Sequence, residues 1–329
     1  MSSVPSAPVA TGNFRPDLAE GMKSYSVEAL ERGLIGLQIA PVVEVGEVTA
    51  DIGKYPLKDL LRIHKTIRAM GSPYATGGLE LGSFVYNTKD QGFMIPLDER
   101  WLKAYRNRYG QAEQHAAETA RQIVMTASEK RTIDTAMDAT ALTGDLTAAV
   151  SVSWDNRTTA KPIDDLSAFR QQAAKNGGIM PNSLALDIPG FEDLINNSQV
   201  LDRISASGAG DKIKPTDVNL KMLAQALNID NIDVSGRLAN MAGRDVAMDL
   251  EYLWPAAQAL LYYKGPNPNN PFELNYMNTF HWGEDGSSIG GVIEVDGDWD
   301  SRSRKVRSRM DTDEERKYDE LGFRITGLR

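Results

Sequence analysis

The side chains that most often perform chemistry are few and scattered in this sequence. Its histidines, His64, His115 and His281, lie far apart, and none begins the H-E-x-x-H pattern of a helical zinc site. The chain contains no cysteine, which excludes disulfide bonds, thiolate metal sites and a cysteine nucleophile. We therefore expect no metal site and interpret each histidine as an incidental surface or packing residue.

One acidic stretch begins like a calcium-binding loop. Asp296, Asp298 and Asp300 have the alternating spacing of the first ligands in such a loop. However, the sixth position is Ser301, where a glycine is needed for the turn, and the twelfth is Arg307, where a glutamate would complete the coordination. The stretch is not predicted to bind calcium.

Cofactor and nucleophile motifs give no support for an enzyme. The segment SGAGDK (207–212) contains two glycines and a lysine, but it lacks the spacing of a phosphate-binding loop. No G-x-G-x-x-G fingerprint of a dinucleotide fold occurs, and a serine-hydrolase elbow is not predicted either. We expect a protein without a cofactor and without catalytic activity.

The composition limits the remaining classes. With 41% hydrophobic and 25% charged residues the chain has the make-up of a globular protein, and no run approaches the roughly 20 apolar residues of a membrane span. A net charge of -9 argues against a sequence-independent nucleic-acid binder, which needs a surplus of Lys and Arg. The first residues lack the apolar core of a secretion signal, so we expect a soluble protein made in a cytoplasm.

A long helix is predicted in the proline-free region between Pro96 and Pro162. Its apolar face is built largely from small residues, including Ala116, Ala120 and Ala127. Small side chains favour close approach to a sheet over deep interdigitation with another helix. An ordinary core helix is the alternative interpretation.

Two strand-like runs, 42–53 and 79–97, precede this helix and predict an extended arm. Between them lies LKDLLRIHKTIRAMGSPYATGG, a short amphipathic helix followed by glycines. An isolated two-stranded ribbon is only marginally stable in water, so this arm needs a neighbour to lie on. After the long helix, strands and helices alternate, as in IDDLSAFRQQAAKNGG and NSLALDI, which indicates a mixed fold of α and β elements.

The last part of the chain contains a basic block, five Lys and Arg residues between 302 and 309. Acidic residues flank it on both sides, at 296–300 and 311–315. Such blocks of opposite sign favour pairing between copies of the chain. A solvated strand or loop face, where exposed pairs contribute only about 0 to 1 kcal/mol each, is an equally weighted alternative.

The order of these elements resembles the major capsid proteins of tailed bacteriophages, which have the Hong Kong 97 fold. The segments that show the resemblance are PVVEVGEVTADIGKYP, GSFVYNTKDQGFMIPLDERW, AMDATALTGDLTAAVSVSW, IMPNSLALDIPGFEDLINNSQVLDRI and LWPAAQALLYYKGP. The resemblance covers almost the whole chain and implies an α+β fold in four parts. These are an N-terminal arm (1–41), an extended β-hairpin loop (42–97), a peripheral domain with the spine helix (98–181 and 281–329) and an apical domain (182–280).

The function implied by the resemblance is structural. Copies of the chain would form hexamers and pentamers and close into an icosahedral shell that encloses double-stranded phage DNA without sequence-specific binding. Scaffolding, portal and decoration proteins are further candidate partners, and no membrane is involved. The protein would be located in the virion after assembly in the bacterial host cytoplasm.

Contacts between copies are expected on the extended loop and on the basic block. The candidate residues are Lys54, Tyr55, Tyr74, Phe84, Tyr86, Arg302, Arg304, Lys305, Arg307 and Arg309.

Two alternatives remain at the level of sequence. The nearer one is the shell of an encapsulin-type compartment, which shares the fold and holds enzymes in place of a genome. The more distant one is an α/β enzyme with an unrecognised site.

Overall fold

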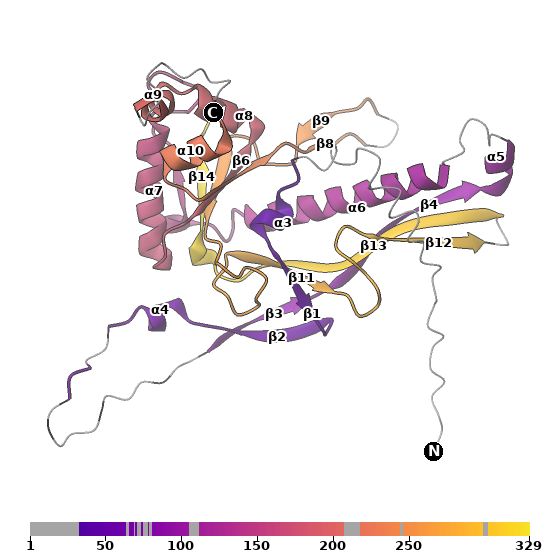
Figure 1. Cartoon of the computed structure of the whole chain (residues 1–329), viewed down its shortest axis with the longest axis horizontal. Helices are drawn as coiled ribbons and strands as arrows, with labels where there is room; N and C mark the ends of the chain where they lie inside the picture. The colour runs from indigo at the N-terminus through magenta and orange to yellow at the C-terminus, as the bar shows by residue number, and fades with distance from the viewer. Residues whose placement is uncertain are drawn as a thin grey trace. The chain divides into compact units, whose positions relative to one another are not determined.

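The computed structural model describes most of the chain (Figure 1). The described residues are 33–63, 66–68, 70, 74, 78, 81–104, 112–206, 218–243, 246–298 and 302–329. Residues 1–32 of the expected N-terminal arm therefore lie outside the described residues, as does His64. The described chain divides into two compact units. Unit one lies within Thr88–Ser128 and His281–Thr312, and unit two within Gly33–Asn87, Glu129–Phe280 and Asp313–Arg329.

Unit one is a small antiparallel sheet covered by a helix. Its strands are β4 (Lys89–Asp98), β12 (Val292–Asp298) and most of β13 (Ser303–Arg316), and β13 pairs with the other two. Its helices are α5 (Glu99–Ala104) and the first half of α6 (Ala112–Ala136). Ala116 and Ala117 of α6 pack on one face of the sheet, around Val306. The alanine-rich face thus meets a sheet closely, as the sequence indicated.

The long helix predicted between Pro96 and Pro162 was expected to extend over 98–142, and helices are confirmed for most of this range, but the predicted end is too late. The structure has two helices there, and the second, α6, already ends at Ala136. Residues 105–111, which include the connection between them, lie outside the described part of the chain.

Unit two is built on a five-stranded sheet with the order β5-β14-β10-β6-β7. The strands are β5 (Thr147–Ala149), β6 (Ser183–Asp187), β7 (Asn231–Ser235), β10 (Gln258–Tyr262) and β14 (Gly322–Thr326). β10 is antiparallel to both of its neighbours, whereas β5 runs parallel to β14 and β7 runs parallel to β6. The central strands β14, β10 and β6 each have a neighbouring strand at both edges.

Alternate residues of these strands enter two separate cores. Leu184, Leu186 and Leu261 face one core, while Ala185 and Leu260 face the other. Successive side chains of a strand point to opposite faces, so a strand that is apolar throughout, such as β6, needs a cover on each face.

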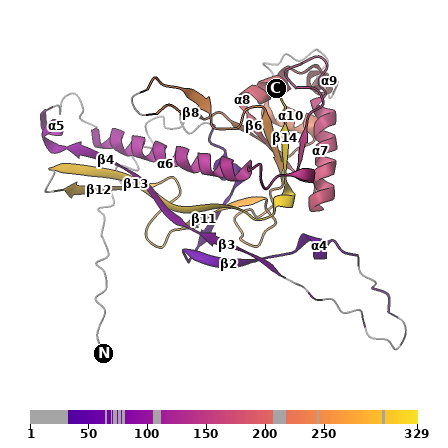
Figure 2. The same cartoon turned by 180° about the vertical axis from the view of Figure 1, so that it is seen from behind.

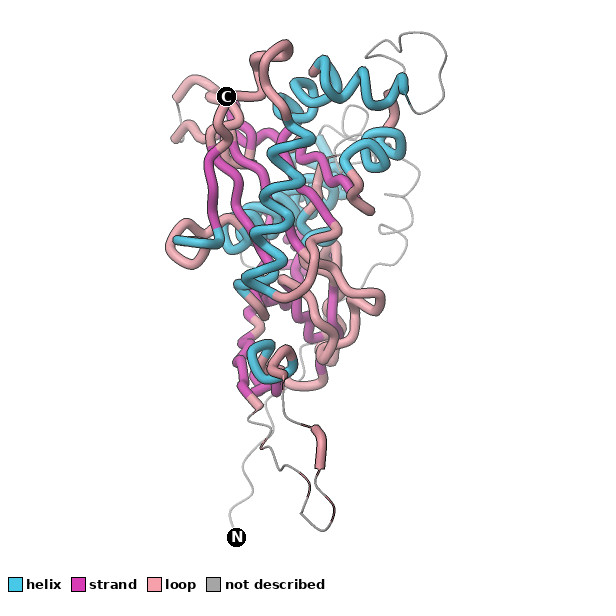
Figure 3. The backbone as a smooth tube through the Cα atoms, turned by 90° about the vertical axis from the view of Figure 1, so that its left-hand side faces the viewer, coloured by secondary structure: helices cyan, strands magenta, loops and turns pink. Residues whose placement is uncertain are grey.

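Four helices cover the first face, and they are α7 (Pro162–Gly177), α8 (Ile188–Asn196), α9 (Ser198–Ala206) and α10 (Leu220–Leu227). Seen from the side of α7 in Figure 3, this helix lies in front of the strands. The prediction of a helix at 163–178 is confirmed, and Gly178 caps it in the left-handed conformation that glycine adopts most easily.

The second core of unit two receives the end of α6 and residues 33–41, the last part of the expected N-terminal arm. Ile35 and Ile39, at and within the short helix α3 (Gly36–Ile39), are buried beside Ile133 of α6. The buried carboxylate of Glu129 accepts hydrogen bonds from the Ile35 and Gly36 amides at 2.8 and 2.7 Å. A Cβ on Gly36 would lie 2.6 Å from this carboxylate, so the contact requires a glycine. Residues 33–41 are therefore anchored within the chain.

The expected hairpin 42–97 is divided among several partners. β1 (Val42–Val45) lies beside β11 (Met277–Trp282), and β4 pairs with β13 in unit one. Only β2 (Thr49–Lys54) and β3 (Gly82–Asn87) form a ribbon together, with the short helix α4 (Leu57–Leu60) after β2 (Figures 1 and 2). A single hairpin from 42 to 97 is thus wrong for its outer parts, because Ile95 and Leu97 of β4 are used in the core of unit one.

A second ribbon pairs β8 (Leu238–Asn240) with β9 (Leu250–Tyr252), and short 3-10 helices occur at Gly144–Leu146 and Asp319–Leu321.

Candidate functional site

The base of the ribbon β2–β3 is fixed by aromatic packing within unit two. The ring of Tyr86 stacks on Phe280 with a centroid distance of 4.8 Å, and Phe84 lies 5.6 Å from the same ring. The Tyr86 hydroxyl donates to the Glu47 carbonyl at 3.1 Å. Burial, with a smaller effect of the Glu47 charge, raises the pKa of Tyr86. Phe84 and Tyr86 therefore face their own subunit, although the sequence suggested them as contacts between copies.

Two adjacent residues of the last segment hold the end of β2. Lys54 donates from Nζ to the Lys317 carbonyl at 3.2 Å and lies 5.4 Å from the centre of the Tyr318 ring. The Tyr55 amide donates to the Tyr318 hydroxyl at 3.1 Å. Lys54 and Tyr55 thus also have partners inside the chain, while the Tyr55 side chain remains exposed.

Lys317 itself is buried and unusual for a lysine. Its Nζ donates to the carbonyls of Pro271 and Glu273 at 2.7 and 2.6 Å. Burial lowers its pKa to about 8, against a smaller opposing effect of Glu273. The two carbonyls satisfy the amine, which allows a lysine to be buried beneath the ribbon.

The loop between β2 and β3 contrasts with this anchored base. Ile63 and Ile67 are 96% and 95% exposed, and Met70 is fully exposed. Tyr74 is also exposed, and its ring lies 4.6 Å from the guanidinium carbon of Arg68. Within the described chain these side chains pack on no hydrophobic core. Leaving apolar side chains in water is unfavourable in free energy.

Sequence reasoning selected Tyr74 in this loop but missed its aliphatic residues. The missed exposed residues are Leu61, Ile63, Ile67, Met70 and Leu81. The segment LKDLLRIHKTIRAMGSPYATGG was interpreted as a short amphipathic turn of helix followed by glycines. In the structure α4 ends at Leu60, so the apolar residues after it are exposed.

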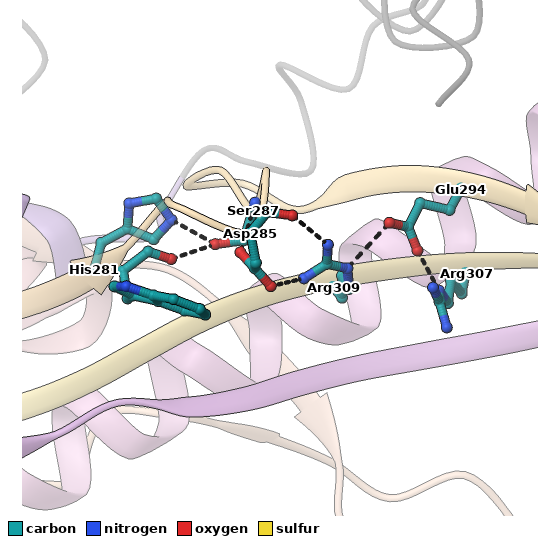
Figure 4. Close-up of polar contacts among 7 residues, drawn as sticks. His281, Asp285, Ser287, Glu294, Arg307 and Arg309 are labelled. Carbon is teal, nitrogen blue, oxygen red and sulfur yellow. Dashed lines mark hydrogen bonds and ion pairs between the residues drawn. The ribbon is translucent and has the colours of Figure 1, made fainter. Parts of the chain in front are cut away.

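The basic block lies on β13 in unit one and finds acidic partners within its own chain. Arg304 pairs with Glu113 of α6, and Arg307 pairs with Glu294 of β12. Arg309 binds both Glu294, at 3.1 Å, and Asp285 (Figure 4). These partners are not the flanking acids that the sequence suggested, because cross-strand register and the helix bring more distant residues close. Among the other two, Arg302 is exposed with φ of +48°, and Lys305 lies opposite Asp296 on β12.

Arg309 and Asp285 form the best-connected pair of this network. Arg309 also donates to the Asp285 carbonyl at 3.0 Å, and the Ser287 amide donates to the Asp285 carboxylate at 2.9 Å. Burial opposes the charged form of Asp285, but the bonds from Ser287 and Arg309 outweigh it and hold its pKa below the usual range. Burial likewise opposes the charge of Arg309, yet its carboxylate partners raise its pKa. The Arg309–Asp285 pair is therefore favoured in its charged form.

A serine and a histidine meet beside this network, but not as a catalytic pair. His281 Nε2 lies 3.1 Å from Ser287 Oγ, and the Ser287 hydroxyl donates to the Trp282 carbonyl at 2.6 Å (Figure 4). The hydroxyl proton therefore points away from the imidazole, and Asp285 binds Arg309 instead of orienting the ring. Both side chains are buried, so the contact is interpreted as structural.

Residues 286–290, GSSIG, have the G-x-S-x-G spacing of a nucleophile elbow, which the motif-based reasoning overlooked. An elbow places its serine on a sharp turn between a strand and a helix. Here the segment connects strands β11 and β12, and His281 contacts Ser287 rather than the central Ser288. The motif therefore lacks the context of a hydrolase site.

The remaining expectations concern metals and membranes. Asp296 and Asp298 lie in strand β12 rather than in a loop. No group of His, Cys, Asp or Glu residues suited to a metal ion occurs among the residues that the structure describes. His115 is exposed near Glu118. No helix in the described ranges has the length and hydropathy needed to cross a membrane.

The ribbon β8–β9 is a second exposed apolar feature that the sequence did not reveal. Val246 and Met248 near its tip are 68% and 71% exposed. Other exposed apolar residues of this ribbon are Leu238, Met241, Leu250 and Tyr252. A strand pattern in the sequence does not state which residues stay exposed in the folded chain.

Comparison with known structures identifies the fold. A phage-related protein from Bordetella bronchiseptica is 17% identical, with a TM-score of 0.68 over 97% of this chain and 98% of that chain. A chain of the bacteriophage PhiM1 mature capsid is 15% identical, with a TM-score of 0.53 over 90% and 86% of the two chains. A chain of the cyanophage P-SCSP1u capsid is 11% identical, with a TM-score of 0.54 over 88% and 86%.

No protein-family model matches the sequence, and no curated protein matches it. The similarity is therefore one of structure. It confirms the α+β Hong Kong 97 fold that was predicted from the sequence.

Proposed function

We propose that the chain is the major capsid protein of a tailed bacteriophage, and that its copies assemble as hexamers and pentamers into a closed icosahedral shell. The observation that supports this most is the extent of the structural similarity, which includes nearly the full length of both this chain and a phage-related protein. Chains from two phage capsids are similar over most of their length as well.

The exposed loop after β2 supports the same function from physical chemistry. A monomer that leaves Ile63, Ile67 and Met70 in water exposes more apolar surface than its own fold requires. Contacts with further copies would cover these side chains. Each such contact can be weak, because many equivalent contacts act together in a closed shell.

In this proposal the parts of the chain take the roles that the resemblance implies. Residues 98–181 and 281–329 form the peripheral domain with the spine helix, residues 182–280 form the apical domain, and the arm lies within 1–41. The extended loop is the part of 42–97 that runs from β2 to β3, since β1 and β4 lie beside strands outside the ribbon. Among the candidate contact residues, Tyr74 is the one whose side chain is exposed beyond the anchored base of the ribbon.

The contents of the shell are proposed to be double-stranded phage DNA, held without sequence-specific contacts. The net charge of -9 suits a container that does not clamp its DNA. Scaffolding, portal and decoration proteins are proposed partners, assembly takes place in the host cytoplasm, and the shell itself has no catalytic role.

Expression of the chain in bacteria, followed by size-exclusion chromatography and negative-stain electron microscopy, tests this function. We expect megadalton particles or capsomers. A monodisperse monomer or dimer under all assembly conditions would contradict the proposal. Particles isolated from phage-infected cells should contain nuclease-protected DNA, whereas an enzyme cargo in place of DNA would favour a compartment of the encapsulin type.

A further inference from the structure

Strands β4 and β13 of unit one place two carboxylates directly opposite each other. Asp90 of β4 is paired with Asp311 of β13 in the antiparallel register. Directly opposed residues of such a pair project from the same face, with roughly 5 Å between their Cβ atoms, and like charges in this arrangement repel each other. The pair is therefore unfavourable unless a positive charge lies beside it.

One of these two carboxylates is buried without a partner. Asp311 is 5% exposed, and its Oδ1 atom has no hydrogen-bond donor within reach. Among the residues that the structure describes, neither Asp311 nor Asp90 forms an ion pair or a side-chain hydrogen bond. A buried charge is normally paired or bound to a metal ion, because its transfer out of water is otherwise costly. Asp311 lacks such a partner within the described chain.

The basic side chains nearest to this pair in the two strands are directed elsewhere. Arg309, two positions before Asp311 and on the same face of β13, is already bound by Asp285 and Glu294. Lys89 lies opposite Thr312, so it projects from the other face of the sheet. Asp90 itself is exposed, so the pair can be reached from solvent. A small cation from solution can therefore supply the missing charge.

We propose that Asp90 and Asp311 together hold a partly hydrated divalent cation, Mg²⁺ or Ca²⁺, between β4 and β13. Both ions prefer oxygen ligands, and Mg²⁺ in particular keeps several waters when one or two carboxylates bind it. The described chain has no group of three His, Cys, Asp or Glu residues suited to a metal ion, so water completes the coordination here. The two residues lie far apart in the sequence, and no spacing motif reveals them.

Thermal unfolding of the isolated subunit tests this site. Mg²⁺ or Ca²⁺ at about 10 mM is compared with EDTA, and sodium chloride keeps the ionic strength equal. The divalent cation should raise the unfolding midpoint by about 2 to 4 °C, because a ligand that binds the folded chain alone stabilises it. Isothermal titration calorimetry with each ion should detect one site per chain.

Substitutions of the exposed Asp90 separate this site from a general salt effect. Asp90→Asn should lose the response to divalent cations, and in EDTA it should be at least as stable as the wild type, because the opposed charges are gone. Asp90→Lys places a positive charge of the chain itself beside Asp311, so it should raise the midpoint in EDTA and also lose the response. The matched control is Asp51→Asn, an exposed acid of β2 opposite Val85, which should keep the wild-type response.

Two results would overturn the cation site. The first is a midpoint that does not respond to divalent cations in the wild type, or that responds equally in Asp90→Asn. The second is a lower midpoint of Asp90→Lys in EDTA, which would show that the two carboxylates do not lack a positive charge. Neither result bears on the proposed shell function, because the site belongs to the single subunit and particle formation is measured separately.

Discussion

The five-stranded sheet of unit two and the loop after β2 use the same kinds of side chain for different purposes. Leu184, Leu261 and Phe323 are completely buried in the sheet, whereas Ile63 and Ile67 are almost completely exposed in the loop. Burial of a large apolar side chain contributes roughly 1.5 to 3 kcal/mol wherever it occurs. In the sheet that free energy stabilises the single chain, and in the loop we expect it to stabilise contacts between chains.

The largest effect is expected when the loop loses its apolar character. Ile63→Ser, Ile67→Ser and Met70→Ser together should reduce the yield of particles more than about tenfold, because several kcal/mol of apolar contact is lost at every interface. The unfolding midpoint of the isolated subunit should not change. The matched control replaces the same residues with leucine and should assemble. Normal particles from the serine variant would show that the loop's apolar side chains are not needed between copies.

The opposite outcome is expected for a side chain of the sheet. Phe323 is 0% exposed and its ring lies 5.7 Å from that of Phe169, so Phe323→Ala should lower the free energy of unfolding by about 3 to 5 kcal/mol. Urea denaturation of the isolated subunit measures this loss. Ile63→Ala is the control in the loop and should change stability by less than about 0.5 kcal/mol. Similar losses of unfolding free energy in Phe323→Ala and Ile63→Ala would show that the loop stabilises the single chain as the sheet does.

Substitutions on the charged face of β13 should lower the stability of the single subunit, as in the sheet, rather than impair assembly, as in the loop. Arg309 pairs with Asp285 and with the buried Glu294, so Arg309→Gln should cost about 1 to 3 kcal/mol, because Asp285 loses this charged partner and Glu294 keeps only its pair with Arg307. Arg304→Gln removes a more exposed pair with Glu113 and should cost about 0 to 1 kcal/mol. Both are measured by denaturation of the isolated subunit. If Arg309→Gln changed only assembly and not subunit stability, the basic block would instead act between copies.

Lys317 gives a smaller, pH-dependent effect at the anchored base of the ribbon. Burial lowers its pKa to about 8, whereas in the unfolded chain the amine keeps its proton to roughly pH 10. Between these values the unfolded state binds more protons, so the free energy of unfolding should rise with pH through this group, by about 1 to 2 kcal/mol. Comparing denaturation at both pH values in the wild type and in Lys317→Met measures the contribution. Lys221→Met, at an exposed site on α10, should keep the wild-type rise; a rise that persists in Lys317→Met would assign it to other groups.

The sequence predicted local structure well where pattern and capping agree. The helix ending at Gly177 and the strand Ser183–Asp187 were predicted almost to the residue, because the glycine signal and the short apolar run are local. The overall fold followed from the order of such elements.

The sequence did not predict which distant residues meet. The partner of Arg304 is Glu113, 191 positions earlier, and Phe84 and Tyr86 pack on Phe280. Within the chain, Arg304 therefore pairs with a distant acid on α6 rather than with an acid close to it in the sequence. Phe84 and Tyr86, which were predicted to contact other copies, pack against their own chain. Exposure of the ribbon β8–β9 depends in the same way on what the rest of the chain leaves uncovered.

Hydrogen–deuterium exchange, compared between assembled particles and isolated subunits, tests the central claim most directly. Amides of Ile63, Ile67 and Met70 should exchange rapidly in the isolated subunit and slowly in the particle, because we expect other copies to cover these exposed residues. Amides of β10 in the buried sheet should be slow in both states. Equal protection of Ile63, Ile67 and Met70 in the subunit and in the particle would contradict the account, since a second copy would then not be what protects them.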